Sequence, residues 1–205
     1  GRMTHVQKRA LEEHWQHWGV EYSGGVLNYD AVFGRSGPVV LEIGFDMGQS
    51  LVAMATEKPE TNFIGIEVHK PGVGKLLHSM EEHGLANIRI YCHDAVEILR
   101  DCIPDASVDT VQIFFPDPWH KKRHNKRRLI QPAFVAQLIR KLKLGGVLHL
   151  ATDWKDYAHQ MLDVLEAVEG LSNSAGDRQF APRPEYRPMT KFEMRGERLG
   201  HGVWD

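Results

Sequence analysis

Short apolar runs alternate with segments of helical periodicity from residue 39 onward. The apolar runs are rich in β-branched residues and end at Gly, Pro or acidic residues, which is typical of buried strands. The predicted strands cover residues 39–43, 62–67, 88–92, 108–115 and 147–150. Between them, apolar residues recur every three or four positions, which predicts helices over residues 50–58, 73–83, 94–102, 132–142 and 154–168, with Ser50 as the cap of the first.

This alternation predicts βαβ units and therefore a mostly parallel sheet. No repeat or linker divides the chain, so we expect one α/β domain over residues 1–205, with a Rossmann-like, doubly wound sheet. The tail, residues 172–205, is rich in Gly, Pro and Arg. It is expected to add short antiparallel pieces, so that the carboxyl-terminal part of the chain forms one lateral edge of the sheet.

A separate helical segment is expected within residues 1–30. Residues 5–18 are amphipathic, because Val6, Leu11, Trp15 and Trp18 recur at roughly helical spacing. We favour a helix that packs across the edge of the sheet. The alternative is that its tryptophans stack on nucleic acid.

Composition narrows the class of protein. The chain has 205 residues, of which 42% are hydrophobic and 25% charged, as in globular proteins of ordinary size. No apolar run is long enough for a membrane span, and no signal peptide is visible at the start. The two cysteines, Cys92 and Cys102, cannot form a disulfide framework and lack zinc-ligand spacing. We therefore expect a soluble cytoplasmic protein without a membrane partner.

The charge is sorted by segment although the net charge is only −2. Residues 121–128 carry six Lys or Arg side chains and no acid. Such a run is often only a solvated face, but beside Trp119 and a pocket it favours contact with RNA phosphates, which gives a basic RNA-binding loop over residues 119–128. His120 and His124 are four residues apart, but the surrounding positive charge disfavours a cation, and we expect no metal site.

An acidic residue stands at or just after the end of every predicted strand. These residues are Glu42, Glu67, Asp94, Asp117 and Asp153. Each alone is readily explained as a helix cap or turn residue. Because the carboxyl ends of parallel strands share one edge, the set together predicts a pocket for a ligand with hydroxyls, an amino group and a positive charge.

The end of the first strand and the loop after it read Glu42-Ile43-Gly44-Phe45-Asp46-Met47-Gly48. Gly44 and Gly48 allow a close approach of a ligand to the backbone before a helix. The spacing departs from the G-x-G-x-x-G dinucleotide fingerprint, which argues against a nucleotide-dependent oxidoreductase. It looks like the S-adenosylmethionine (SAM) loop of class I methyltransferases.

The segment Phe114-Phe115-Pro116-Asp117-Pro118-Trp119-His120-Lys121 is more specific. Through it the chain strongly resembles the bacterial tRNA (guanine-N7)-methyltransferases (the TrmB family). The likeness extends over nearly the whole chain, including residues 41–45, 65–69, 92–95, 114–128, 151–154, 183–184 and 190–193. It implies the class I methyltransferase fold, SAM as cofactor and tRNA as substrate, with the variable-loop guanine as target.

The resemblance also implies a role for individual positions. Cofactor-binding positions would be Glu42, Gly44, Gly48, Glu67, Asp94, Ala95 and Asp117, of which Asp117 is also the implied catalytic residue. Positions implied for the guanine or tRNA are Lys121, Asp153, Thr190, Lys191, Phe192 and Glu193. Positions implied for RNA contact are Arg123, His124, Asn125, Lys126, Arg127 and Arg128.

One position departs from the family pattern, because Asp46 stands where the middle glycine of the SAM loop is usual. A side chain there either crowds the cofactor or requires a backbone angle unfavourable for Asp. A tRNA-binding protein with impaired SAM binding is therefore the alternative function. Within the methyltransferases, Asp117-Pro118-Trp119 is also a loose relative of the motif of enzymes that methylate exocyclic amino groups, but the basic loop favours guanine N7. We expect a monomer.

Overall fold

The computed structural model describes residues 1–187 and 203–205. Its strands are β1 (Val39–Ile43), β2 (Asn62–Ile66), β3 (Ile88–Tyr91), β4 (Val108–Phe114) and β5 (Leu142–Ala151). The α-helices are α1 (His5–Trp18), α2 (Tyr29–Phe33), α3 (Gln49–Glu57), α4 (Lys70–His83), α5 (Ala95–Asp101), α6 (Pro132–Lys141) and α7 (Lys155–Glu166). Two 3₁₀ helices, η1 (Tyr22–Gly24) and η2 (Lys122–Arg127), complete the described elements.

The strands form one sheet in the order β3-β2-β1-β4-β5, and every pair is parallel. This confirms the predicted parallel α/β fold. The chain moves outward from β1 through β2 to β3, and then returns to the other side of β1 with β4. The reversal of strand order therefore falls between β1 and β4, where a doubly wound sheet opens a crevice for ligands.

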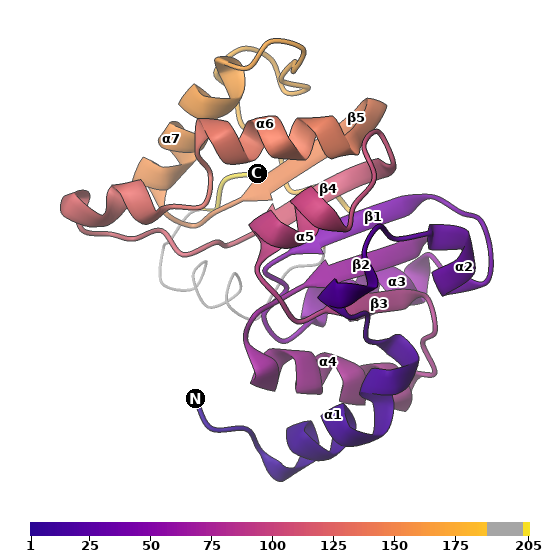
Figure 1. Cartoon of the computed structure of the whole chain (residues 1–205). Helices are drawn as coiled ribbons and strands as arrows, with labels where there is room; N and C mark the ends of the chain where they lie inside the picture. Colours follow the sequence, from indigo (N-terminus) through magenta and orange to yellow (C-terminus); the bar gives the residue numbers. More distant parts are fainter. Residues whose placement is uncertain (188–202) are drawn as a thin grey trace.

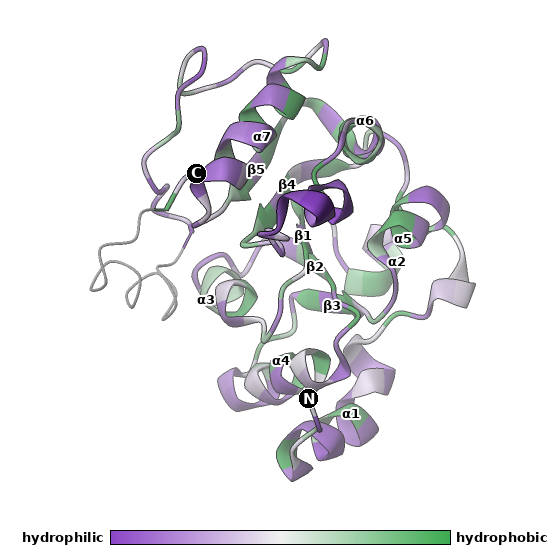
Figure 2. Cartoon of the chain, turned by 90° about the vertical axis from the view of Figure 1, so that its left-hand side faces the viewer, coloured by the Kyte–Doolittle hydropathy of each residue, from purple (hydrophilic) through white to green (hydrophobic). Residues whose placement is uncertain are grey.

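Helices cover both faces of the sheet (Figures 1 and 2). On one face, α3 and α4 bury Leu51, Met54, Leu76 and neighbouring residues against Val40 and Phe63. On the other, α5, α6 and α7 bury side chains against alternate residues of the same strands, including Leu41 and Ile64. Adjacent residues of a strand point to opposite faces, so a fully buried strand such as β1 supplies both clusters.

The structure corrects three predicted element starts. Ser50 does not cap α3, because Gly48, with φ of 80°, occupies the N-cap position and Ser50 is buried inside the helix. Helix α4 begins at Lys70 rather than residue 73, with Pro71 in its first turn, where the missing N–H has no helical partner to lose. Strand β5 begins at Leu142, but its pairing with β4 is irregular before Val147.

Helix α1 packs on α4, which supports packing over nucleic-acid stacking as the role of its tryptophans. Ala10 is buried, and Trp15 and Trp18 lie against the apolar cluster beneath α4. The two helices approach closely at Gly74, where a Cβ atom would lie 2.5 Å from the carbonyl oxygen of Gln7. The chain then reaches the outer strand of the sheet, where Val20 N donates a 2.8 Å hydrogen bond to the carbonyl oxygen of Ile90.

The expected antiparallel edge is not seen as a strand among the described residues. They contain one isolated antiparallel bridge, between Thr152 and Trp204. Within the same residues, none of the helices has the length and apolar character needed to span a membrane.

Candidate active site

The predicted acidic residues gather at one edge of the sheet because all strands run in the same direction. Glu67, Asp94, Asp117 and Asp153 follow the carboxyl ends of β2, β3, β4 and β5, respectively. Glu42 is the penultimate residue of β1. Asp94 and Asp117 are exposed, whereas Glu42 is only 2% exposed. The edge thus offers carboxylates in both aqueous and buried surroundings.

Glu42 lies at the point where the strand order reverses. It pairs in register with Gln112 of β4, and the Gln112 Nε2 donates a 2.7 Å hydrogen bond to its Oε1. Burial raises the pKa of Glu42 to about 7, against the opposing effect of this hydrogen bond, and the nearby Glu67 adds to the rise. Sequence reasoning missed Gln112, although a polar residue within an apolar strand was an available signal.

The loop from Gly44 to Gly48 adopts left-handed backbone at three positions. Gly44 and Gly48 have φ of 71° and 80°, and Asp46 has φ of 55°. The expectation of an unfavourable angle at Asp46 is therefore confirmed, and Asp is among the few residues that tolerate it. The loop also approaches α4 closely, because a Cβ atom on Gly72 would lie 1.9 Å from the carbonyl oxygen of Asp46.

Glu67 ties this loop to the end of β2. Its Oε1 accepts a 2.8 Å hydrogen bond from Asp46 N, and its Oε2 accepts hydrogen bonds from Val68 N and His69 N at 2.8 and 3.1 Å. A carboxylate has about four acceptor positions, so these bonds leave room on Oε1 for a further donor. Glu67 therefore orders the loop and keeps limited capacity for a ligand hydroxyl.

Asp94 and Asp117 both make the local hydrogen bonds expected of cap and turn residues. Asp94 Oδ1 accepts from Glu97 N at 3.1 Å and caps α5, whose first residue is Ala95. Asp117 Oδ1 accepts from Trp119 N at 2.9 Å. Both carboxylates remain exposed at the edge of the site, so a role as a cap or turn residue does not prevent either of them from binding a ligand.

The segment around Asp117 is conformationally strained. Phe115 and Trp119 have φ of 53° and 44°, a region that bulky residues rarely adopt. Each such residue costs about 1–3 kcal/mol and persists only where surrounding contacts impose it. The ring of Phe115 lies against Arg187, whose guanidinium is 5.5 Å from the ring centroid. Strain of this kind is concentrated at functional sites.

The predicted RNA-binding residues other than Arg128 lie on η2, which follows this segment and is the strongly hydrophilic stretch in front of β4 in Figure 2. Lys121 occupies the N-cap position of η2 and is exposed, as are Arg123, Lys126 and Arg127. Arg127 lies over the Trp119 ring at 5.1 Å, and the His124 ring lies 6.0 Å from the same ring. Asn125 is half-buried at the base of η2.

Arg128 is placed differently from its neighbours. Its side chain is 1% exposed, and its guanidinium donates to the Pro118 carbonyl and to Asp156. A buried guanidinium engaged in this way cannot contact a phosphate without leaving its partners. The RNA contact expected at Arg128 would therefore require its side chain to leave Pro118 and Asp156. The run of basic residues did not reveal which of its members points inward.

The substrate positions are only partly described. Asp153 is half-buried between Thr152, which bridges to Trp204, and Trp154, whose ring contacts His120 at 4.2 Å. Asp205 binds the buried Arg187 and accepts a 2.9 Å hydrogen bond from His149, which fastens the end of the chain beneath β4 and β5. Thr190, Lys191, Phe192 and Glu193 lie outside the described residues.

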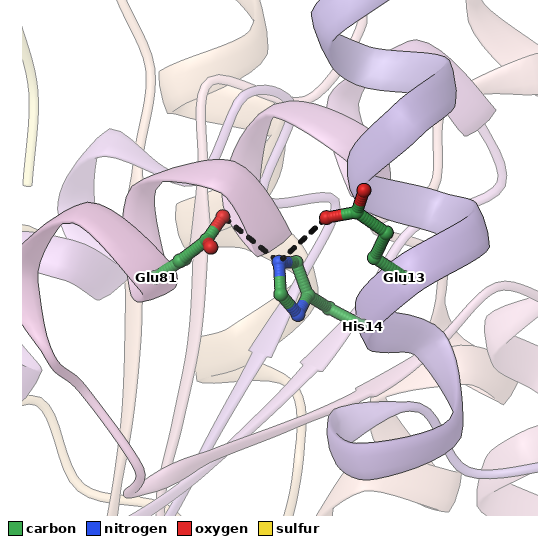
Figure 3. A group of neighbouring side chains, drawn as sticks. All are labelled: Glu13, His14 and Glu81. Atoms are coloured by element: carbon green, nitrogen blue, oxygen red, sulfur yellow. Dashed lines mark ion pairs between the residues drawn. The ribbon is translucent and has the colours of Figure 1, made fainter.

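The group of potential metal ligands among the described residues lies between α1 and α4 rather than in this site (Figure 3). His14 Nε2 is 2.8 Å from Glu81 Oε2 and 3.8 Å from Glu13 Oε2. Both carboxylates are about half exposed. The group is accounted for by side chains that meet where α1 packs on α4. His120 and His124, the spaced pair in the sequence, contact different tryptophan rings.

The fold and this edge define a class I methyltransferase-like protein. One solved structure with a related fold is precorrin-6y C5,15-methyltransferase from Geobacter metallireducens GS-15, with a TM-score of 0.51 at 19% identity, covering 69% of this chain and 72% of that one. A family model described as "Putative methyltransferase" matches residues 36–205.

Sequence comparison identifies the family within this class. The chain is 59% identical to the tRNA (guanine-N(7)-)-methyltransferase of Alcanivorax borkumensis, over all of this chain and 86% of that protein. It is 59% identical, with the same coverage, to the protein of that name from Klebsiella pneumoniae subsp. pneumoniae. The chain belongs to the family of tRNA (guanine-N(7)-)-methyltransferases.

Proposed function

We propose that this protein transfers the methyl group of SAM to N7 of the variable-loop guanine in tRNA. The observation that carries the proposal is the identity of 59% over the whole chain with relatives of that name. The arrangement of acidic residues and the basic η2 around one edge of the sheet supports it independently.

The residues at this edge suit SAM, which presents ribose hydroxyls, an amino group and a positive sulfonium. We assign Glu42, Gly44, Gly48, Glu67, Asp94, Ala95 and Asp117 to its binding. Carboxylates accept hydrogen bonds from hydroxyl and amino groups and attract a cation. Space around Gly44 is open, since a Cβ atom there would meet nothing within 4 Å. When bound, SAM supplies an electrophilic methyl group.

Guanine N7 carries an in-plane lone pair at neutral pH, so no base is needed to remove a proton before transfer. The protein must hold N7 in line with the methyl group, and such positioning contributes roughly 7–11 kcal/mol. Transfer places positive charge on the purine. We assign Asp117 to stabilise this charge as it develops and to accept hydrogen bonds from the guanine N1–H and amino group. Its exposure and its fixed Oδ1 contact are consistent with that role.

We assign Lys121, Asp153 and residues 190–193 to the guanine or the adjoining tRNA. Arg123, His124, Asn125, Lys126 and Arg127 would contact the RNA backbone without reading its sequence. Arg127 and His124 pack on Trp119, so side chains of η2 contact the segment that holds Asp117.

Replacement of Asp117 by Ala tests the catalytic assignment. We expect kcat to fall about 100- to 1,000-fold because the charge on the purine loses its partner, while the Kd for SAM changes only severalfold. The assay is transfer from labelled SAM to an unmodified tRNA transcript, with the methylated base located by borohydride–aniline cleavage.

Two further variants complete this test. Asp117→Asn keeps the size and the local acceptor but removes the charge, and it should lose nearly as much activity. Glu60→Gln removes an exposed carboxylate ahead of β2, at the opposite edge of the sheet, and should behave as wild type. Equal losses of kcat and SAM affinity in the Asp117 variants would refute the catalytic role.

Asp46 is the specific observation that favours a second function, a tRNA-binding protein with impaired SAM binding. Its left-handed backbone and exposed carboxylate stand in the cofactor loop. The same assay separates the two functions, since wild-type protein that binds tRNA but transfers no methyl group would establish the second.

We also propose that the protein acts as a monomer in the cytoplasm, without a metal ion, and that an antiparallel edge completes its sheet. The Thr152–Trp204 bridge, with hydrogen bonds of 2.9 and 2.8 Å, supports the antiparallel edge. Light scattering with and without tRNA measures the oligomeric state, and activity after treatment with a chelator tests the requirement for a metal.

A further inference from the structure

The peptide group between Pro118 and Trp119 is held from both sides. Its carbonyl oxygen accepts a 2.7 Å hydrogen bond from Arg128 Nε, and its N–H donates a 2.9 Å hydrogen bond to Asp117 Oδ1. These two bonds share one rigid peptide plane. Rotation of that plane would therefore break both bonds together and release the Asp117 carboxylate.

The arginine side of this arrangement is fixed to α7. Arg128 Nη2 donates a 2.8 Å hydrogen bond to Asp156 Oδ2, and the guanidinium lies 4.8 Å from the centroid of the Tyr157 ring. The Tyr157 hydroxyl in turn accepts a 3.1 Å hydrogen bond from Ile130 N. The guanidinium thus connects the Asp117 segment, the end of η2 and the first turn of α7.

The Asp117 segment depends on such external contacts. Pro116 and Pro118 have no N–H to donate, so the segment cannot form a regular backbone ladder. Phe115 and Trp119 both have left-handed backbone, which surrounding structure must impose. The bond from Arg128 supplies a contact on the central peptide of this strained stretch.

We infer that Arg128 is a positioning residue that orients the Asp117 carboxylate through the 118–119 peptide, rather than a contact to RNA. This inference rests on the proposed role of Asp117 in methyl transfer. A cation on the carbonyl side polarises the peptide and strengthens the N–H donor that faces the carboxylate. Arg suits this task because its planar fork donates in two directions at once, toward Pro118 and toward Asp156.

The decisive variant is Arg128→Lys, which keeps the charge but has one ammonium in place of the fork. We expect kcat to fall roughly 10- to 100-fold, because a small displacement of a catalytic group is costly. The Kd values for SAM and tRNA should stay within about twofold, and the salt dependence of tRNA binding should be unchanged, because no phosphate contact is lost.

Two further variants show what is expected of a phosphate contact and of a positioning residue, respectively. Lys126→Ala removes an exposed cation of η2, and it should lower the salt slope of tRNA binding by about 0.7–0.9 log units per log unit of salt, which marks a phosphate contact. Asp156→Asn weakens only one arm of the fork and leaves the Pro118 bond. It should therefore reduce kcat less than Arg128→Lys does.

Chemical rescue separates positioning from a purely structural role. In Arg128→Ala, millimolar ethylguanidinium should restore part of the lost kcat, whereas ethylammonium should not. Thermal melts of the same variant, measured in parallel, show whether it is folded at the assay temperature.

Three results would overturn the inference: wild-type kcat in Arg128→Lys, a reduced salt slope in that variant, or loss of activity that follows unfolding and does not respond to guanidinium. A wild-type protein that transfers no methyl group would instead refute the proposed function.

Discussion

Left-handed, non-glycine residues lie on both sides of the proposed cofactor site, in the segments that follow β1 and β4. Asp46 lies in the loop after β1, and Phe115 and Trp119 flank Asp117 after β4. Two of them are held by a neighbouring carboxylate: Glu67 accepts from Asp46 N, and Asp117 accepts from Trp119 N. At the scale of residues, individual side chains thus hold unusual backbone conformations beside the proposed site.

The strain at Asp46 makes a prediction for Asp46→Gly. Glycine adopts the same φ without steric cost, so the melting temperature should rise by about 2–4 °C, equivalent to about 1 kcal/mol. Loss of the side chain from the cofactor loop should tighten SAM binding about fivefold. Calorimetric melting and titration measure the two effects.

Ala106→Gly is the matched control, because Ala106 also has a left-handed φ, of 49°, but precedes β4 at the opposite edge of the sheet. It should stabilise the fold without changing SAM affinity. An Asp46→Gly variant with weaker SAM binding would show that the carboxylate assists the cofactor.

At the scale of elements, helix α4 packs closely against both the cofactor loop and α1. Two glycines of this helix allow close backbone contacts on different sides. Gly72 accommodates the carbonyl oxygen of Asp46, and Gly74 accommodates that of Gln7 in α1. The helix therefore sets the position of both the cofactor loop and the amino-terminal helix.

These contacts predict different effects for two similar substitutions. Gly72→Ala should displace the cofactor loop and weaken SAM binding about tenfold, since a methyl group cannot fit 1.9 Å from a carbonyl oxygen. Gly74→Ala should destabilise the fold by about 1–3 kcal/mol through α1 but leave SAM affinity near wild type. Equal SAM affinities in the two variants would contradict this division.

At the scale of the whole molecule, the fold buries the carboxyl group of Glu42 in the protein interior. Burial raises its folded-state pKa from the ordinary value of 4.5 to about 7, so the folded protein binds its proton more tightly than the unfolded chain does. The resulting stabilisation is fully present below pH 4.5 and is lost as the pH rises through about 7.

Glu42→Gln should remove this dependence. The free energy of unfolding should decline less steeply between about pH 4.5 and 7, and the variant should be more stable than wild type at pH 8, by at most about 3 kcal/mol. Urea unfolding across this pH range is the measurement. Glu12→Gln, an exposed control, should keep the wild-type slope. A steeper slope in Glu42→Gln would show that the ionised carboxylate stabilises the fold.

Local patterns were sufficient for some features and insufficient for others. The strand ends and their acids followed from short-range signals, as did the unusual backbone at Asp46. Ser50 was misplaced as a cap because a left-handed glycine can begin a helix equally well. The internal contacts of Gln112 and Arg128 were not anticipated, because their partners lie 70 and 10 residues away, respectively.

The sequence by itself determined the parallel α/β fold, the acidic edge, the family and the basic character of the segment after β4. The fold, the acidic edge and the basic segment follow from periodicity, residue type and spacing, which the chain expresses locally, whereas the family follows from the resemblance of its motifs. Only the tertiary structure decided that Glu42 is buried beside Gln112, and that Arg128 turns inward while its basic neighbours remain exposed. Burial and hydrogen-bond partners depend on which distant segments meet, and for a charged side chain they decide between solvent, a ligand and an internal contact.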